Sequence, residues 1–202
     1  MLTSFNSTHD ALRLHTKQAH YELDHLPCFQ QLLSNQVGLK EYATCLSALS
    51  SWYSCHEKRL HKQRQIKRNL PFIQTKSDLI SKDLDALSFN RDLPRSSDFR
   101  LVESGPCDLG RQLGFLYVIE GSTLGGLVIA PKIEKVLNRK DITHFYRCYR
   151  ENKVKNFALT MDFIHQYCEE NKCMNETQEG ALQAFRQLQE WMLVSYSNKQ
   201  VA

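Results

Sequence analysis

The feature that most constrains this chain is a glycine-rich stretch within an otherwise helical pattern, Gly110 to Asn138. On both flanks apolar residues recur at three- and four-residue intervals, which is typical of a helix. Between the flanks lie Gly121, Gly125 and Gly126, and each costs about 1 kcal/mol relative to alanine inside a helix. The stretch is therefore either two helices joined by a turn or one helix with a bare strip of backbone.

Three structures fit these glycines. A Gly-Gly pair commonly marks a turn, and on spacing alone the turn is favoured. Gly121 and Gly125 are four residues apart and share one face, so a close contact with another helix is the second possibility. The third is a helix bent over a planar ligand. A phosphate-binding loop is excluded, because the chain has no GxxxxGK[ST] motif and no GxGxxG following a strand.

The rest of the chain also favours helices. Strand-like alternation and Asn-Gly or Asp-Gly hairpin turns are missing, so we expect an all-α bundle forming one domain over residues 1–202. The expected helices cover about 7–26, 30–34, 39–65, 77–87, 109–138, 141–170 and 177–196. Asp108 is expected to cap the glycine-rich helix, after a surface loop over Asn90–Pro106.

Composition narrows the class of protein. The net charge of +4 is too small to indicate nucleic-acid binding, and the basic run His56–Arg68 fits the solvated end of a helix. The seven cysteines are scattered without a CxxC pair, which indicates reduced thiols. Because no run of 18 apolar residues and no apolar N-terminal signal occurs, we expect a cytoplasmic protein without a membrane span.

One histidine has supporting neighbours. Arg13, Thr16 and His20 share a helix face, with Arg13 roughly 10 Å along the axis from His20. Asp24, one turn after His20, is placed to accept the ring N–H that does not bind metal. No second histidine or cysteine at ligand spacing accompanies His20, so a haem iron fits better than zinc. On spacing alone, a partly buried helix face accounts for the pattern better than a metal site.

Two motifs resemble those of the haem oxygenases, particularly the soluble bacterial biliverdin-forming group. They are LGFLYVIEGSTLGG (Leu113 to Gly126) and LRLHTKQAHYELD (Leu12 to Asp24). The resemblance implies that His20 is the proximal haem ligand, that Arg13 meets a haem propionate and that Asp24 orients the histidine. It also implies a single-domain haem-oxygenase-like helical bundle.

The same resemblance implies that the glycine-rich helix kinks over the distal haem face, with Gly121 and Gly125 beside the iron-bound oxygen. Ser122 stands where mammalian members carry an aspartate, as in the bacterial group. Bacterial members tend to have a Trp-Arg pair where this chain has Val154-Lys155. The predicted site is thus His20 as metal ligand, Gly121, Ser122 and Gly125 as catalytic residues, and Arg13, Thr16, Asp24, Tyr117, Gly126 and Lys155 as cofactor contacts.

The implied activity is O₂- and electron-dependent cleavage of haem b to biliverdin, CO and Fe²⁺, with haem as both substrate and cofactor. A separate reductase or ferredoxin must supply electrons, because no flavin or nicotinamide motif is visible. The exposed basic residues Lys58, Arg59, Lys62 and Arg64 are candidates for docking it, although a solvated helix end explains them as well. We expect a monomer or weak dimer that binds neither nucleic acid nor membrane.

Alternatives remain open. A haem-carrying protein of the same fold would share His20 and the glycines. A non-haem relative, such as a thiaminase-like or di-iron protein, is a second alternative. A di-iron site needs a pair of Glu-x-x-His motifs, which this chain lacks, and no cysteine is singled out as a thiaminase nucleophile.

Overall fold

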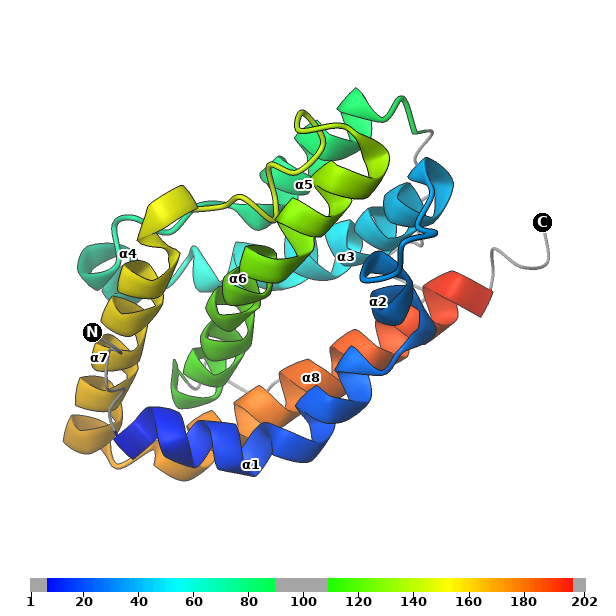
Figure 1. Cartoon of the computed structure of the whole chain (residues 1–202). Coiled ribbons are helices and arrows are strands. Elements are labelled where there is room, and N and C mark those ends of the chain that lie inside the picture. The colour runs from blue at the N-terminus through cyan, green and yellow to red at the C-terminus, as the bar shows by residue number, and fades with distance from the viewer. Residues whose placement is uncertain (1–6, 90–108, 198–202) are drawn as a thin grey trace.

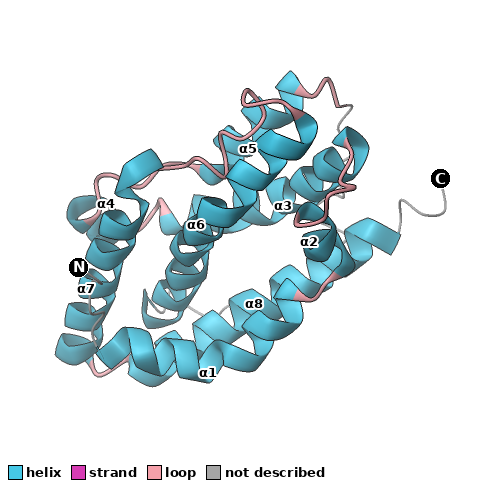
Figure 2. Cartoon of the chain, viewed as in Figure 1, coloured by secondary structure: helices cyan, strands magenta, loops and turns pink. Residues whose placement is uncertain are grey.

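The computed structural model describes residues 7–89 and 109–197, and within these ranges all regular secondary structure is helical (Figure 2). The elements are α1 (Ser7–Asp24), α2 (Pro27–Leu32), α3 (Leu39–Leu60), α4 (Arg64–Asn69), α5 (Lys76–Ala86), α6 (Leu109–Leu137), the 3₁₀ turn η2 (Arg150–Asn152), α7 (Lys153–Asn171) and α8 (Met174–Ser197). The all-α prediction is confirmed. The predicted loop at Asn90–Pro106 and the Asp108 cap lie outside the described residues.

The helices pack around α6, which contacts α8 most extensively (Figure 1). A side chain cannot fit where these two helices cross. A Cβ atom on Gly114 would lie 2.2 Å from the Thr177 carbonyl oxygen, and one on Gly180 would lie 2.1 Å from the Arg111 oxygen. Helix α1 lies beside α8 along the lower edge in Figure 1, and α3 packs on α5.

The turn that spacing alone favours at the glycines is wrong, because α6 is one helix of 29 residues, as the resemblance to the haem oxygenases implies. All described glycines have negative φ, so none provides the left-handed conformation that commonly ends a helix. In Figure 1 the helix changes direction partway along its length. Pro131 lies within the helix and removes one backbone hydrogen bond, which is a common cause of a bend.

Helix α6 is long and apolar enough to cross a membrane by length and composition. However, 61% of its apolar window is buried inside the protein. The core helix of a globular domain passes the same test, so this property does not assign α6 to a membrane.

The predicted helix over 141–170 is wrong in its first part. Residues 138–149, the connecting segment, form turns, and α7 begins only at Lys153. Side chains satisfy the backbone there: Asp83 accepts the His144 and Phe145 N–H groups at 2.8 and 2.9 Å. The Lys153 ammonium donates to the Tyr146 and Cys148 carbonyls at 2.7 and 2.5 Å. These distant partners replace the helical hydrogen bonds that local periodicity predicts.

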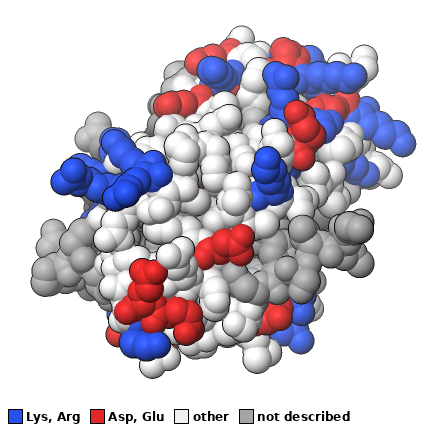
Figure 3. Space-filling view, turned by 90° about the vertical axis from the view of Figure 1, so that its left-hand side faces the viewer, with Lys and Arg blue, Asp and Glu red and all other residues white. Residues whose placement is uncertain are grey.

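Other boundaries shift less. The helix predicted over 39–65 is two helices, α3 and α4, and the second helix starts at Pro27 because proline is well suited to a first turn. In the basic run, Lys58, Arg59, Lys62 and Arg64 are exposed as expected, whereas His56 is buried. None of the six described cysteines forms a disulfide. Figure 3 shows charges of both signs on one face, with neither sign dominating.

Candidate functional site

A cavity of about 670 Å³ lies between α1 and α6, within the size range of small-molecule and cofactor sites. Helix α1 supplies most of its polar groups, and α6 supplies the opposite wall. Apolar side chains from the other elements close it: Phe29 and Leu33 near α2, Leu49 on α3, Phe145 and Tyr146 on the connecting segment, Phe157 on α7, and Phe185 and Leu188 on α8.

The α1 wall carries His20 and Asp24, one helical turn apart. His20 Nδ1 lies 2.9 Å from Asp24 Oδ2, so an N–H at this nitrogen donates to the carboxylate and leaves Nε2 as the nitrogen with a lone pair. The His20 ring also packs edge-on against Phe185, with centroids 5.3 Å apart. The side chain is 56% exposed, so its orientation comes from these two contacts rather than from burial.

Arg13 and Thr16 line the same wall. Buried Thr16 donates to the Leu12 carbonyl at 2.8 Å and is hydrogen-bonded to Tyr117 of α6. Burial raises the pKa of Tyr117, so its hydroxyl stays protonated at neutral pH. Arg13 and the neighbouring Lys17 give this end of the cavity positive charge, which suits an anionic group on a ligand.

The α6 wall is bare where Gly121 and Gly125 face the cavity. A Cβ on Gly121 would meet its nearest atom, Phe157 Cε2, at 3.5 Å, and one on Gly125 would meet Ile129 Cδ1 at 3.9 Å. Both are ordinary contact distances, so neighbouring protein atoms do not require glycine here. The missing side chains leave free space on the cavity side of the helix.

Between the two glycines, Ser122 has a fixed hydroxyl. It donates to the Ile119 carbonyl at 2.8 Å, and its oxygen lies 2.6 Å from the hydroxyl oxygen of Tyr53. Because the serine proton is already used, Tyr53 is the donor in that bond. Burial raises the pKa of Tyr53, with a further rise from the charges of Glu57 and Glu120, which keeps the donor protonated.

Two predicted contacts lie away from the cavity. Gly126 faces the connecting segment, where a Cβ would lie 2.1 Å from the Tyr146 carbonyl oxygen, so packing explains this glycine. Lys155 is exposed on α7 and does not line the cavity. The remaining predicted residues, Arg13, Thr16, His20, Asp24, Tyr117, Gly121, Ser122 and Gly125, all line it.

Sequence reasoning missed several lining residues. Tyr53 lies at apolar helical spacing in the helix predicted over 39–65, which is typical of a core residue. Phe145 belongs to a segment predicted to be helical. His9, taken as structural or exposed, lines the cavity beside Tyr117 and Phe157. Burial lowers the pKa of His9. The available signal was the position of His9 about three helical turns before His20 on one face of the same helix.

A family model described as "Heme oxygenase" matches residues 6–194, and the chain therefore belongs to the haem oxygenase family. The fold is similar to that of the haem oxygenase from Neisseria meningitidis crystallised with NO and CO (TM-score 0.71, 19% identity, 94% of this chain and 92% of that one). It is also similar to the haem oxygenase from Leptospira interrogans (TM-score 0.69, 15% identity, 93% and 98% coverage). No curated protein matches the sequence.

The residues present fit a haem. Within the described ranges, no cluster of three or more His, Cys, Asp or Glu side chains is able to hold a metal ion. A lone histidine with an oriented ring suits haem iron, which needs only one or two protein ligands. The glycine face leaves room for a flat ligand, and Arg13 and Lys17 suit its carboxylates.

Proposed function

We propose that this protein is a haem oxygenase that cleaves haem to biliverdin, CO and Fe²⁺ with O₂ and external electrons. One observation carries the proposal. The cavity has the oriented imidazole of His20 on one wall and the bare backbone of Gly121 and Gly125 on the other. A bound haem would supply the iron that activates O₂ and the ring carbon that is oxidised.

The α1 residues would bind and orient the substrate. His20 Nε2 would hold the iron, and Asp24 would keep the ring in the required tautomer. Arg13 would pair with a propionate, with Thr16 and Tyr117 alongside. The side formed by Gly121 and Gly125 would leave room for a diatomic ligand. The Neisseria relative was crystallised with NO and CO, which supports diatomic binding in general.

Ser122 and Tyr53 would order the water that carries protons to the glycine side. Their hydroxyls form a directed pair in which Tyr53 donates to Ser122 and Ser122 donates to the Ile119 carbonyl. Because burial keeps Tyr53 protonated, the pair would orient water at the cavity wall rather than give up its own protons.

The wider context also remains a proposal. We propose a single cytoplasmic domain over residues 1–202, a monomer or weak dimer, that receives electrons from a separate reductase or ferredoxin. The six described cysteines are not paired in disulfides, and unpaired cysteines are typical of proteins in a reducing compartment. Exposed Lys58, Arg59, Lys62 and Arg64 are candidates for the donor contact.

Haemin titration followed by reduction under air tests this function. A Soret band that decays while a biliverdin band grows is the expected result, and a stable band would instead indicate a haem carrier. The His20→Ala variant should lose the wild-type Soret band. No band in the wild type, or an unchanged band in His20→Ala, would overturn the site assignment.

A further inference from the structure

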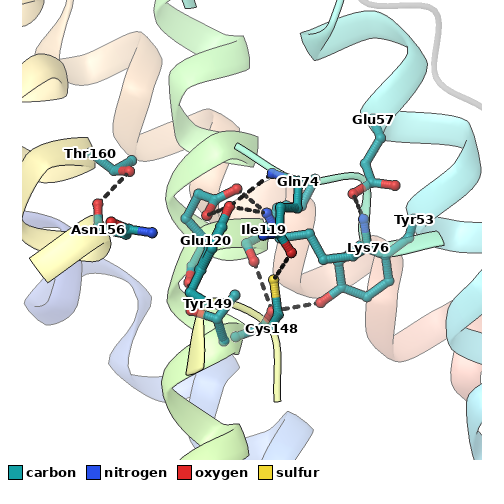
Figure 4. Close-up of polar contacts among 12 residues, drawn as sticks. Tyr53, Glu57, Gln74, Lys76, Ile119, Glu120, Cys148, Tyr149, Asn156 and Thr160 are labelled. Atoms are coloured by element: carbon teal, nitrogen blue, oxygen red, sulfur yellow. Dashed lines mark hydrogen bonds and ion pairs between the residues drawn. The ribbon is translucent and has the colours of Figure 1, made fainter. Parts of the chain in front are cut away.

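A buried polar cluster lies behind the cavity wall of α6. It comprises Glu57 on α3, Lys76 at the start of α5, Glu120 on α6 and Tyr149 at the end of the connecting segment (Figure 4). The side chains of Lys76 and Glu120 are 0% and 1% exposed. Ionisable groups are rarely buried so completely unless they are paired, and the proposed chemistry does not use them.

The cluster is internally satisfied around Glu120. Lys76 Nζ forms an ion pair with Glu120 Oε1, and the hydroxyl of Tyr149 donates to Glu120 Oε2 at 2.9 Å. Lys76 Nζ also donates to the Tyr149 hydroxyl oxygen at 2.9 Å. Both carboxylate oxygens of Glu120 are therefore held, and the rotation of α6 at this residue is fixed from behind.

The partners of Glu120 are themselves fixed. Glu57 accepts the backbone N–H groups of Lys76 and Ser77 at 2.5 and 3.0 Å, which ties the start of α5 to α3. The Gln74 N–H donates to the Tyr149 hydroxyl oxygen at 3.2 Å. The cluster thus joins α3, α5, α6 and the connecting segment at one point.

This point lies next to the hydrogen-bonded pair of Tyr53 and Ser122. Glu120 directly precedes Gly121 and Ser122 on α6, and Glu57 lies one helical turn after Tyr53 on α3. Successive residues on a helix are about 100° apart around its axis, so fixing Glu120 also fixes the direction of Ser122. The two helices are therefore tied twice, by the cluster behind α6 and by the Tyr53–Ser122 bond at the cavity.

We propose that Lys76, Glu120 and Tyr149 are positioning residues that hold the Ser122 hydroxyl against Tyr53 at the cavity wall. The proposal rests on the proposed function, because it concerns the same site. Stability alone does not require the cluster, since replacing a buried ion pair by apolar residues is often neutral or stabilising. A solely structural cluster would leave the Tyr53–Ser122 bond unchanged when replaced in that way.

The test uses the haem-free protein and the hydroxyl proton of Tyr53, observed by NMR and assigned by its loss in Tyr53→Phe. In Lys76→Met/Glu120→Leu, which removes both charges, the protein should remain folded while this resonance shifts or is lost to solvent exchange. The matched control is Glu134→Leu/Arg147→Met. It removes an ion pair between α6 and the connecting segment, with O–N distance 2.7 Å, and should leave the resonance in place.

Each result for the Tyr53 resonance either supports or overturns the positioning role. An unmoved resonance in the folded double variant would overturn the positioning role. If the double variant does not fold, the variant Tyr149→Phe is used, because it removes only the bridging hydroxyl. The Tyr53 resonance should shift in this variant, and an unmoved resonance would again overturn the proposal.

Measurements on the haem-loaded protein distinguish a failure of this proposal from a failure of the proposed function. The double variant should bind haemin with unchanged affinity but form biliverdin at least about 10-fold more slowly, because small misplacements reduce rates by such factors. Unchanged biliverdin formation by the double variant would overturn the positioning role. A wild-type protein that forms no biliverdin would defeat the proposed function, whereas the resonance measured without haem would still decide the positioning role.

Discussion

Helix α6 uses glycine for opposite reasons at different positions. At the packed positions, Gly114 and Gly126 lie against backbone, where a Cβ would approach carbonyl oxygens of α8 and the connecting segment to 2.2 and 2.1 Å. On the cavity face, Gly121 and Gly125 have ordinary contact distances around them. The packed glycines bring the helix close to its neighbours, and the cavity glycines keep space free. The difference indicates that the cavity glycines serve a ligand rather than the fold.

The packed position at Gly114 should not tolerate a methyl group. Gly114→Ala should reduce the free energy of unfolding by about 3 kcal/mol or more, because the neighbouring atoms are backbone and cannot move aside individually. Urea unfolding of the haem-free protein measures the effect. A loss below about 1 kcal/mol would show that the crossing of α6 and α8 is looser than described.

Water should also be excluded where α6 packs on α3. His56 reports on this region, because its ring stacks on Phe115 of α6 with centroids 4.7 Å apart, and the pH dependence of stability tests it. Burial lowers the pKa of His56 to about 3, so the unfolded chain takes up a proton near pH 6.5 that the folded protein excludes. The His56 contribution is therefore complete above pH 6.5. It declines by roughly 1.4 kcal/mol per pH unit as the pH falls from 6.5 toward 3.

The matched variant His56→Phe should lack this part of the pH dependence. Denaturant titrations of both proteins between pH 7 and 4.5 make the comparison. Parallel pH profiles for the two proteins would contradict a dry environment at this position.

At Gly121, on the cavity side of α6, an added methyl group should increase stability slightly. Gly121→Ala should raise the free energy of unfolding of the haem-free protein by about 0.5–1 kcal/mol, since alanine favours helix and its Cβ would lie 3.5 Å from Phe157. Gly126→Ala is the matched control and should have the opposite sign. Thermal melts of both variants measure the two changes in stability. A loss of stability in both variants would remove the distinction between the cavity glycines and the packed glycines.

The residues predictable from sequence were those that one helix brings together. Helical spacing places Arg13, Thr16, His20 and Asp24 on one face, and the resemblance to haem oxygenases identified that face as a haem site. The all-α fold followed from the same signal.

What sequence reasoning missed depends on contacts between distant segments. Spacing cannot separate Gly125 from Gly126, because close packing and open space require the same residue. The segment 138–149 has helical apolar spacing, yet Asp83 and Lys153 satisfy its backbone from elsewhere. The pairing of Lys76 with Glu120, 44 residues apart, has no local signature.

The central claim is that the face carrying Gly121 and Gly125 covers the reacting side of a bound haem, and Gly125→Leu tests it most directly. The variant should keep the Soret band and an affinity for haemin within a few-fold of wild type, since His20 is untouched. Biliverdin formation, followed by its absorbance with a reductase system under air, should fall at least about 10-fold because the leucine fills the space needed for O₂. Wild-type biliverdin formation in Gly125→Leu would contradict the account.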